Sequence, residues 1–150
     1  RRYDTKLYAK VCKKIDPDVA ITTDIITGFP GETAQDHKES MLFAKKIGFA
    51  KLHVFPFSPR PLTPAAKMPD QIPEKVKLAR ALEFRKLGEK LRREFIESQL
   101  GKKTDILFEE TKDGKTFTGW TGNYIKVRVS GKDLTNKIVP VRLTKAQVVS

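Results

Sequence analysis

Cysteine is almost absent from this chain of 150 residues, which contains Cys12 and no other. One cysteine excludes a disulfide within the chain, a zinc site made of cysteines alone and the three-cysteine ligand set of an iron–sulfur cluster. Neither His37 nor His53 has a second His, Cys or Asp at metal-ligand spacing, so the sequence predicts no metal site. The lack of disulfides suits a reducing compartment, and we expect the protein to be cytoplasmic.

Long hydrophobic runs are also missing, and acidic residues are in short supply. No apolar stretch approaches the roughly 18–20 residues of a membrane helix, and no signal-peptide pattern is visible in the residues given. The chain has 18 Asp and Glu against 30 Lys and Arg, a net charge of +12. This charge favours a polyanionic partner such as nucleic acid; the alternative is a merely well-solvated basic surface. Because the chain begins with Arg1 and not Met, we expect it to be part of a longer protein.

The first half alternates helix and strand patterns. Residues 5–15 and 33–47 have helical spacing of apolar positions, and Gly48 is a plausible helix stop. Residues 19–26 form a nearly continuous β-branched and apolar run, which predicts a strand buried on both faces, and 51–57 predicts a second strand. Strand, helix and strand within about 40 residues match a βαβ unit. Two strands make an incomplete parallel sheet, whose exposed edge could pair with a second copy as a homodimer or strand swap.

The second half contains one long helix followed by short strands. Residues 58–73 are a proline-rich loop, and the helix runs from Pro73 to about Leu100 with an imperfect apolar stripe. The stripe consists of Leu78, Leu82, Leu87, Leu91 and Phe95. Turn signals, among them Lys112-Asp113-Gly114, separate five short strands predicted at 104–110, 115–120, 123–129, 137–143 and 146–149. This pattern predicts a small closed barrel of the OB type.

Two regions carry residues suited to ligand binding in the first half. Gly28 and Gly31 lie between a predicted strand and a helix, where ligands of parallel α/β folds bind. Glycine lets the backbone approach a ligand and Glu32 accepts hydrogen bonds, although the loop lacks the P-loop and dinucleotide patterns; the alternative is a tight structural turn. Arg60, after the second strand, is the best cation there for a carboxylate or phosphate; otherwise it is a surface arginine.

Aromatic and basic residues alternate with apolar ones in the predicted barrel. Tyr124, Lys126 and Arg128 are predicted on one face of the strand 123–129, with Ile125, Val127 and Val129 on the other. Trp120 is close by in the sequence. An aromatic side chain flanked by cations can stack a base and hold phosphates, so we expect RNA contact. The alternative is that the aromatic residues close the ends of the barrel.

Taken together, these stretches resemble the methylthiotransferases, a family of radical S-adenosylmethionine (SAM) enzymes. Residues 21–33 (ITTDIITGFPGET) are similar to a late-strand segment of the family's central domain. Residues 58–66 (SPRPLTPAA) resemble its next signature, which usually has glycine where Leu62 stands. Arg1-Arg2-Tyr3 resembles the end of an Arg-rich signature, and 119–127 resembles the TRAM domain, a small RNA-binding barrel. The resemblance implies the end of a radical SAM (β/α) barrel at 1–72, a linking helix at 73–100 and a TRAM barrel at 101–150.

The resemblance also implies cofactors, although this chain lacks part of what they need. Enzymes of the family use SAM and two [4Fe–4S] clusters, one of them held by CxxxCxxC, and those cysteines are missing here, so we expect no activity from this chain alone. The implied SAM-binding residues are those that match the family's glycine loop and adenine segment: Gly28, Phe29, Gly31, Glu32, Phe55 and Pro56. Arg60 matches the substrate side.

The implied substrate is a modified adenosine in tRNA. Residues 52–58 and 67–73 look most like the branch that acts on threonylcarbamoyladenosine beside the anticodon. The expected partner is therefore the anticodon stem-loop, bound by Trp120, Tyr124, Lys126, Arg128 and Arg60. The alternatives are the isopentenyladenosine branch, the branch that modifies a ribosomal protein, and a basic RNA-binding module with no enzymatic parent.

Overall fold

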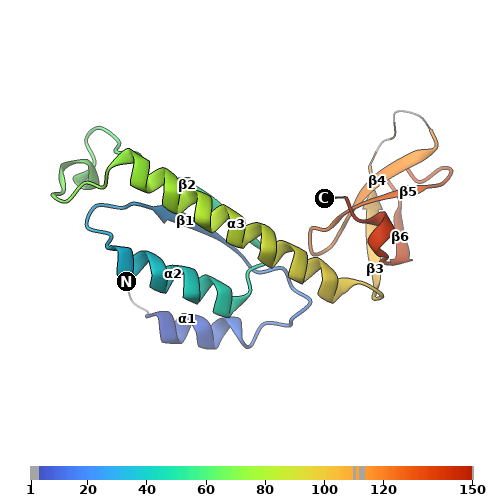
Figure 1. Ribbon diagram of the computed structural model, residues 1–150. Helices are drawn as coiled ribbons and strands as arrows, with labels where there is room; N and C mark the ends of the chain where they lie inside the picture. Colours follow the sequence, from blue (N-terminus) through green and yellow to red (C-terminus); the bar gives the residue numbers. More distant parts are fainter. Residues whose placement is uncertain (1–3, 110, 112–113, 150) are drawn as a thin grey trace. The chain divides into compact units, whose positions relative to one another are not determined.

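The computed structural model describes residues 4–109, 111 and 114–149, and these residues form two compact units (Figure 1). Residues through Asp16 together with Ile21–Arg93 make the first unit; Pro17–Ala20 with the residues from Glu94 onward make the second. The chain therefore has the mixed helix and sheet composition that was predicted. The expectations at Arg1-Arg2-Tyr3 and at Lys112-Asp113 lie outside the described residues. No helix within the described ranges has the length and apolar content to cross a membrane.

The first unit contains a two-stranded parallel sheet and helices. Its elements are α1 (Thr5–Cys12), β1 (Thr22–Thr27), α2 (Ala34–Ile47), β2 (Lys51–Pro56), the 3-10 turn η1 (Pro64–Lys67) and most of α3 (Glu74–Gln99). A capping box begins α2, in which Thr33 and Asp36 bond each other's backbone N–H groups at 2.9 and 3.1 Å. Gly48 ends this helix in the left-handed region, at φ 73°, which confirms the predicted stop.

One face of the β1–β2 sheet is covered and the other is open. Ile25 and Val54 are partners in the parallel ladder and pack with Phe49 and Phe84 in the core. On the other face Ile26 and its ladder partner Phe55 are 56% and 53% exposed. The prediction of a strand buried on both faces is therefore wrong for the described residues. An apolar, β-branched run identifies a strand, but only tertiary contacts show which faces are covered.

The predicted apolar stripe of α3 is wrong in its first turns. Leu78 and Leu82 are exposed, whereas Ala81 and Phe84 are fully buried. A Cβ added at Gly88 would lie 3.3 Å from Leu52 Cβ, so this glycine occurs where the helix passes closely over β2. The packing partner selects the buried face of a helix that carries leucines on more than one side.

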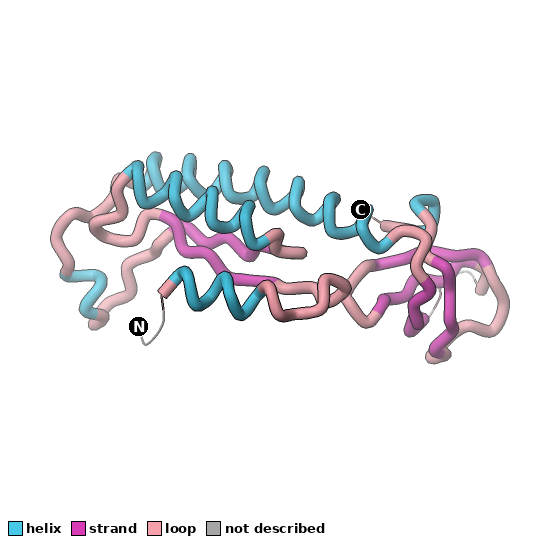
Figure 2. The backbone as a smooth tube through the Cα atoms, turned by 90° about the horizontal axis from the view of Figure 1, so that it is seen from below, coloured by secondary structure: helices cyan, strands magenta, loops and turns pink. Residues whose placement is uncertain are grey.

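The second unit is built on an antiparallel sheet with the strand order β5-β4-β3-β6. Its elements are β3 (Lys103–Phe108), β4 (Thr116–Thr121), β5 (Lys126–Ser130), β6 (Ile138–Arg142) and the 3-10 turn η2 (Lys145–Gln147), which Figure 2 shows in cyan. Among the described residues the sheet does not close, so the predicted closed barrel is corrected to an open four-stranded sheet. The strand predicted at 146–149 is replaced by η2 and a single bridge from Val148 to Val127, because a Thr144–Gln147 capping box turns the chain.

The inward face of this sheet forms the second core. Its fully buried side chains are Ile106, Phe108, Phe117, Ile125, Val127 and Leu143. Phe95, Ile96 and Leu100, at the end of α3, pack against this cluster. The predicted alternation along β5 is confirmed, because Val127 is buried while Arg128 is exposed.

Candidate functional site

The loop after β1 is closed by Glu32 and fastened to α3. Glu32 Oε2 accepts the Gly28 N–H at 2.9 Å, and Oε1 accepts Arg80 Nη1 at 2.7 Å. Arg80 also donates to the Glu32 carbonyl oxygen at 3.0 Å. The Glu32 and Arg80 side chains are 16% and 12% exposed, so this ion pair is largely shielded from water. Glu32 thus holds the loop in shape, and its carboxylate retains lone pairs for a further donor.

Gly28 is enclosed by Lys77, another residue of α3. The Gly28 backbone is left-handed at φ 71°, and a Cβ there would lie 2.4 Å from Lys77 Cγ. The Thr27 hydroxyl donates to the Lys77 carbonyl at 3.2 Å. The buried Lys77 ammonium lies 5.4 Å from the Phe57 ring centre and 3.4 Å from Glu74 Oε2. Lys77 and Arg80 were missed by the sequence interpretation, because they follow the loop by about fifty residues and carry no recognisable motif.

Aromatic side chains gather at the carboxyl ends of β1 and β2. Phe29 packs edge to face against Phe57 with ring centres 5.2 Å apart, and Phe29 remains partly exposed. Phe55 lies on the open face beside Ile26, while Pro56 is the half-buried last residue of β2. Exposed aromatic surface at this edge can hold a planar group by stacking.

The loop after β2 reaches the same edge of the sheet through backbone bonds. Gly31, at φ 81°, donates its N–H to the Asp70 carbonyl at 3.0 Å. Arg60 is exposed, and its carbonyl accepts the Thr63 hydroxyl at 2.8 Å. Leu62 is 96% exposed in the left-handed region at φ 68°, a backbone geometry that suits the glycine usual in the resembled signature.

The structure therefore brings the two loops themselves together at one sheet edge. The contacts that join these loops run through Gly31 and Asp70 and through the Phe29–Phe57 ring pair. Within the described residues, the Arg60 side chain makes no contact with the glycine loop, and its one hydrogen bond named above is made by its backbone carbonyl.

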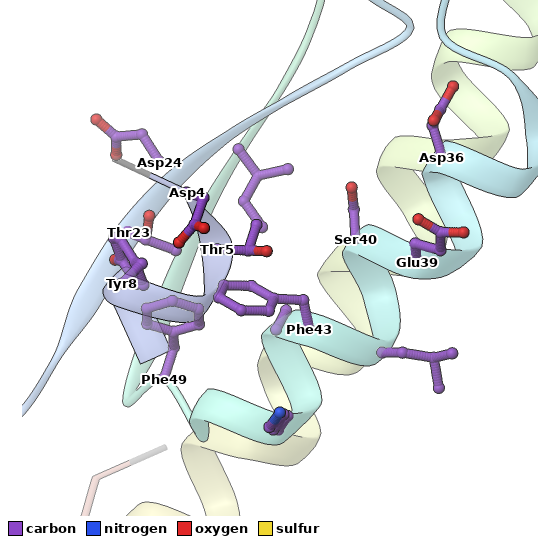
Figure 3. Close-up of a pocket in the computed structure, with 14 residues that line it drawn as sticks. Asp4, Thr5, Tyr8, Thr23, Asp24, Asp36, Glu39, Ser40, Phe43 and Phe49 are labelled. Atoms are coloured by element: carbon purple, nitrogen blue, oxygen red, sulfur yellow. The ribbon is translucent and has the colours of Figure 1, made fainter. Parts of the chain in front are cut away.

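A separate open cavity of about 890 Å³ lies among α1, β1 and α2 (Figure 3). Figure 3 shows Tyr8, Phe43 and Phe49 grouped at one side, with the carboxylates of Asp4 and Asp24 nearby. None of the predicted site residues is among the fourteen residues that line it. The cavity is therefore distinct from the predicted ligand-binding edge.

On the outward face of the second unit's sheet, Trp120 and Lys126 form a cation–π pair. They are ladder partners on β4 and β5, and the Lys126 ammonium lies 5.3 Å from the Trp120 ring centre. Arg128 is exposed on the same face, opposite Thr118. The Trp120 indole N–H donates to Glu109 Oε1 at 3.2 Å, which orients the ring. Three of the predicted RNA-binding residues therefore share one face.

Tyr124 belongs to the turn before β5 and not to the strand, which corrects its predicted place in the alternation. It is 75% exposed and adopts φ 61°, an unusual conformation for a bulky side chain. Its N–H donates to the Thr121 carbonyl at 3.0 Å, while the Thr121 hydroxyl accepts the Ile125 N–H at 2.9 Å and donates to Asn123 Oδ1 at 2.6 Å. These hydrogen bonds within the turn fix part of its conformation.

The Asn123 amide connects this turn to residues at the end of α3 and before β1. Its Nδ2 donates to Gln99 Oε1 at 3.2 Å and to the Asp18 carbonyl at 3.1 Å. Asp18 accepts hydrogen bonds from Lys102 and from Gln99, and these bonds lower the pKa of its carboxyl. All these residues belong to the second unit. The sequence shows no signal for this network, because Asp18 and Asn123 are 105 residues apart.

The described residues offer no ligand set for an iron–sulfur cluster. Within the described ranges, no three His, Cys, Asp or Glu side chains form a group that could hold a metal ion, and Cys12 is the chain's single cysteine. The residues present therefore do not fit a [4Fe–4S] cluster.

Comparison with known proteins finds similarity over nearly the whole chain. No family model matches. The chain is 39% identical to the threonylcarbamoyladenosine tRNA methylthiotransferase MtaB of Bacillus subtilis, over 97% of this chain and 34% of the relative. It is 39% identical to a tRNA-2-methylthio-N(6)-dimethylallyladenosine synthase of Acetivibrio thermocellus, over 95% and 31%, and 39% identical to a ribosomal protein uS12 methylthiotransferase RimO of Lachnoclostridium phytofermentans, over 94% and 34%. The chain spans about a third of the length of these curated relatives.

Proposed function

The chain belongs to the methylthiotransferase family, and we propose that it is the carboxyl-terminal part of a radical SAM enzyme that methylthiolates threonylcarbamoyladenosine in tRNA. The similarity to a tRNA enzyme of that specificity and the order of the motifs along the chain support this proposal. In this proposal, residues 1–72 are the end of the radical SAM domain, 73–100 are a linking helix, and 101–150, with their open sheet, are the TRAM domain. A cytoplasmic location follows from the tRNA substrate.

The first unit would contribute to the SAM site through the edge described above. Phe29, Phe55 and Pro56 offer apolar surface for the adenine, and Gly31 leaves open space, since a Cβ there would meet no atom within 4 Å. Glu32 and Gly28 act mainly by shaping the loop, since Arg80 and Lys77 occupy their inner sides. SAM supplies the radical and the methyl group when bound. The two clusters would be held by parts of the protein outside this chain.

The observation that carries the RNA-binding part of the proposal is the Trp120–Lys126 pair beside Arg128. Packing against the indole holds the Lys126 ammonium at the solvent-exposed face, where it can bind a phosphate. The indole ring can then stack on a base. Tyr124 adds a second exposed ring at the adjacent turn, and Arg60 is an exposed cation of the first unit. These features favour an anticodon stem-loop as the partner.

Binding of the chain to an unmodified anticodon stem-loop across a salt series tests this function. We expect tighter binding than to a scrambled hairpin and a steep fall in affinity with salt. The double variant Lys126→Ala/Arg128→Ala should weaken binding and flatten the salt dependence by about two units of slope, because each lost phosphate contact removes about one.

The double variant Lys132→Ala/Lys145→Ala is the matched control, since it removes the same charge from positions outside the strands. Equal losses in the two double variants would show generic charge attraction and would contradict a specific face. Equal, weak binding to both hairpins would instead favour the protein-modifying branch, because the uS12-modifying relative is as similar to this chain as the tRNA enzymes are, at 39% identity.

A further inference from the structure

A row of four ladder partners crosses the outward face of the second unit's sheet. Ile138 of β6 is paired with Leu107 of β3, Leu107 with Trp120 of β4, and Trp120 with Lys126 of β5. The four strands are labelled in Figure 1. We call these four residues the cross-strand row. Neighbouring strands lie about 4.8 Å apart, so the row is about 14 Å long.

The apolar members of the cross-strand row are unusually open to solvent. Ile138 is 67% exposed, Leu107 50% and Trp120 37%. The residues before and after Leu107, Ile106 and Phe108, are almost completely buried, so the row belongs to the solvent side of a sheet whose other side already forms the core. Three adjoining apolar side chains on a solvated sheet face indicate a contact surface, because the core does not use them.

The charges around the row are complementary to a polyanion. Lys126 occupies one end of the row and Arg128 follows two residues further on the same side of β5. Towards the opposite ends of β3 and β6, the exposed side chains of Lys103 and Arg142 are ladder partners on the outward face. Among the described residues, the acidic side chains on this side are Asp105, between Lys103 and Leu107, and Glu109, which accepts the Trp120 indole N–H. Arg128 therefore lies on one side of the cross-strand row, and Lys103 and Arg142 lie on the other.

We propose that the cross-strand row is a binding strip for unpaired RNA bases, in which Leu107 and Ile138 extend the Trp120 platform. This inference rests on the proposed RNA-binding function and names the form of RNA that the face takes. Apolar side chains gain contact with the faces of splayed bases, whereas a duplex shields those faces and presents phosphates and sugars. The four-stranded sheets of other RNA-binding modules stack two or three bases on exposed aromatic side chains, the part that Trp120 would play here.

Binding of the full 150-residue chain to two RNA probes tests the strip. One probe is an unstructured seven-nucleotide RNA and the other is the same sequence annealed to its complement. Leu107→Thr and Ile138→Thr keep strand-forming residues at exposed positions, so the fold should persist. Each should weaken binding of the unpaired RNA about fivefold or more, with an unchanged salt slope, and leave binding of the duplex unchanged.

Leu42→Gln is the matched control, since Leu42 is similarly exposed but belongs to the first unit. Quenching of Trp120 fluorescence, the chain's single tryptophan, reports contact at the row directly, and a thermal melt of each variant checks the fold. Quenching by unpaired RNA that Leu107→Thr weakens would support the strip.

Two outcomes would overturn the inference while leaving RNA binding itself intact: equal losses for both probes, or full affinity of both variants for unpaired RNA. The second would exclude Leu107 and Ile138 from the RNA contact. Failure of the unchanged chain to bind either RNA would overturn the proposed function together with this inference.

Discussion

Gly28 and Gly31 lie in one loop, both with positive φ, but their surroundings differ. A Cβ at Gly28 would overlap Lys77, whereas one at Gly31 would meet no atom within 4 Å. Glycine is therefore required at position 28 by close packing against Lys77, whereas at position 31 the space beside the backbone is open.

Gly31→Ala should cost about 1 kcal/mol of unfolding free energy, from the left-handed backbone alone. Gly28→Ala should cost a further 1–3 kcal/mol, roughly, because Lys77 and the start of α3 must move. Calorimetric unfolding of both variants beside the unchanged chain measures the difference. Equal losses would show that Lys77 yields freely and that its close packing on Gly28 has no energetic role.

At the scale of elements, the β4–β5 hairpin is held by groups far along the chain. Asn123 bonds Gln99 and the Asp18 backbone, and the Asp18 carboxylate accepts from Gln99 and Lys102. The turn that presents Tyr124 therefore depends on residues before β1 and at the end of α3.

The stability of the second unit should fall in acid through Asp18. Its folded-state pKa is lowered from the ordinary 3.8 by hydrogen bonds from Lys102 and Gln99. The charged form therefore favours folding: the contribution is present above the ordinary pKa and is lost as pH falls through the lowered value. Asp18→Asn should lower the melting temperature at pH 7. Between pH 5 and about 2, the melting temperature of this variant should fall less than that of the unchanged chain.

Thermal melts followed by Trp120 fluorescence, which reports the second unit, measure this effect. Asp105→Asn is the control, a carboxylate on the outward side of β3. Melting temperatures that decline in parallel for Asp18→Asn and the unchanged chain would mean that Asp18 does not contribute to the acid response.

At the scale of the whole molecule, the first unit leaves apolar surface and strand edges open. Ile26 and Phe55 are exposed on the open sheet face, and so are Leu7 and Val11 of α1. Within the described residues the sheet contains β1 and β2 alone, so each has an edge without a strand partner. In the proposed full-length enzyme, other parts of the protein would cover this surface.

The chain by itself should therefore associate through the open sheet. Light scattering across a concentration series should show a rise from monomer towards dimer mass. Ile26→Lys places a charge on the open face and should shift the chain back to monomer, whereas Leu42→Lys on α2 should not. A monomer at all concentrations, or an equal effect of the two substitutions, would contradict association through this sheet.

Much of the architecture follows from local sequence. The helical spacing over 33–47 and Gly48 predicted where α2 begins and ends, and the structure confirms a helix at Ala34–Ile47 that stops at Gly48. Alternation along β5 placed Val127 inward and Arg128 outward, because successive strand residues point to opposite faces whatever surrounds them. Capping and alternation are properties of a few neighbouring residues, so sequence alone determines them.

Only the tertiary structure decided what covers each face and which strands are neighbours. In the tertiary structure one side of β1 is open, and the second sheet does not close within the described residues. The buried side of α3 contains Ala81 and Phe84, whereas Leu78 and Leu82 are exposed. The tertiary structure also placed Lys77 and Arg80 against the glycine loop and aligned Ile138, Leu107 and Trp120 in one row. Strand register and packing bring together residues that are far apart in the chain. The alternation within one strand does not specify which residues of a neighbouring strand are its partners, so these features could not be predicted from local sequence.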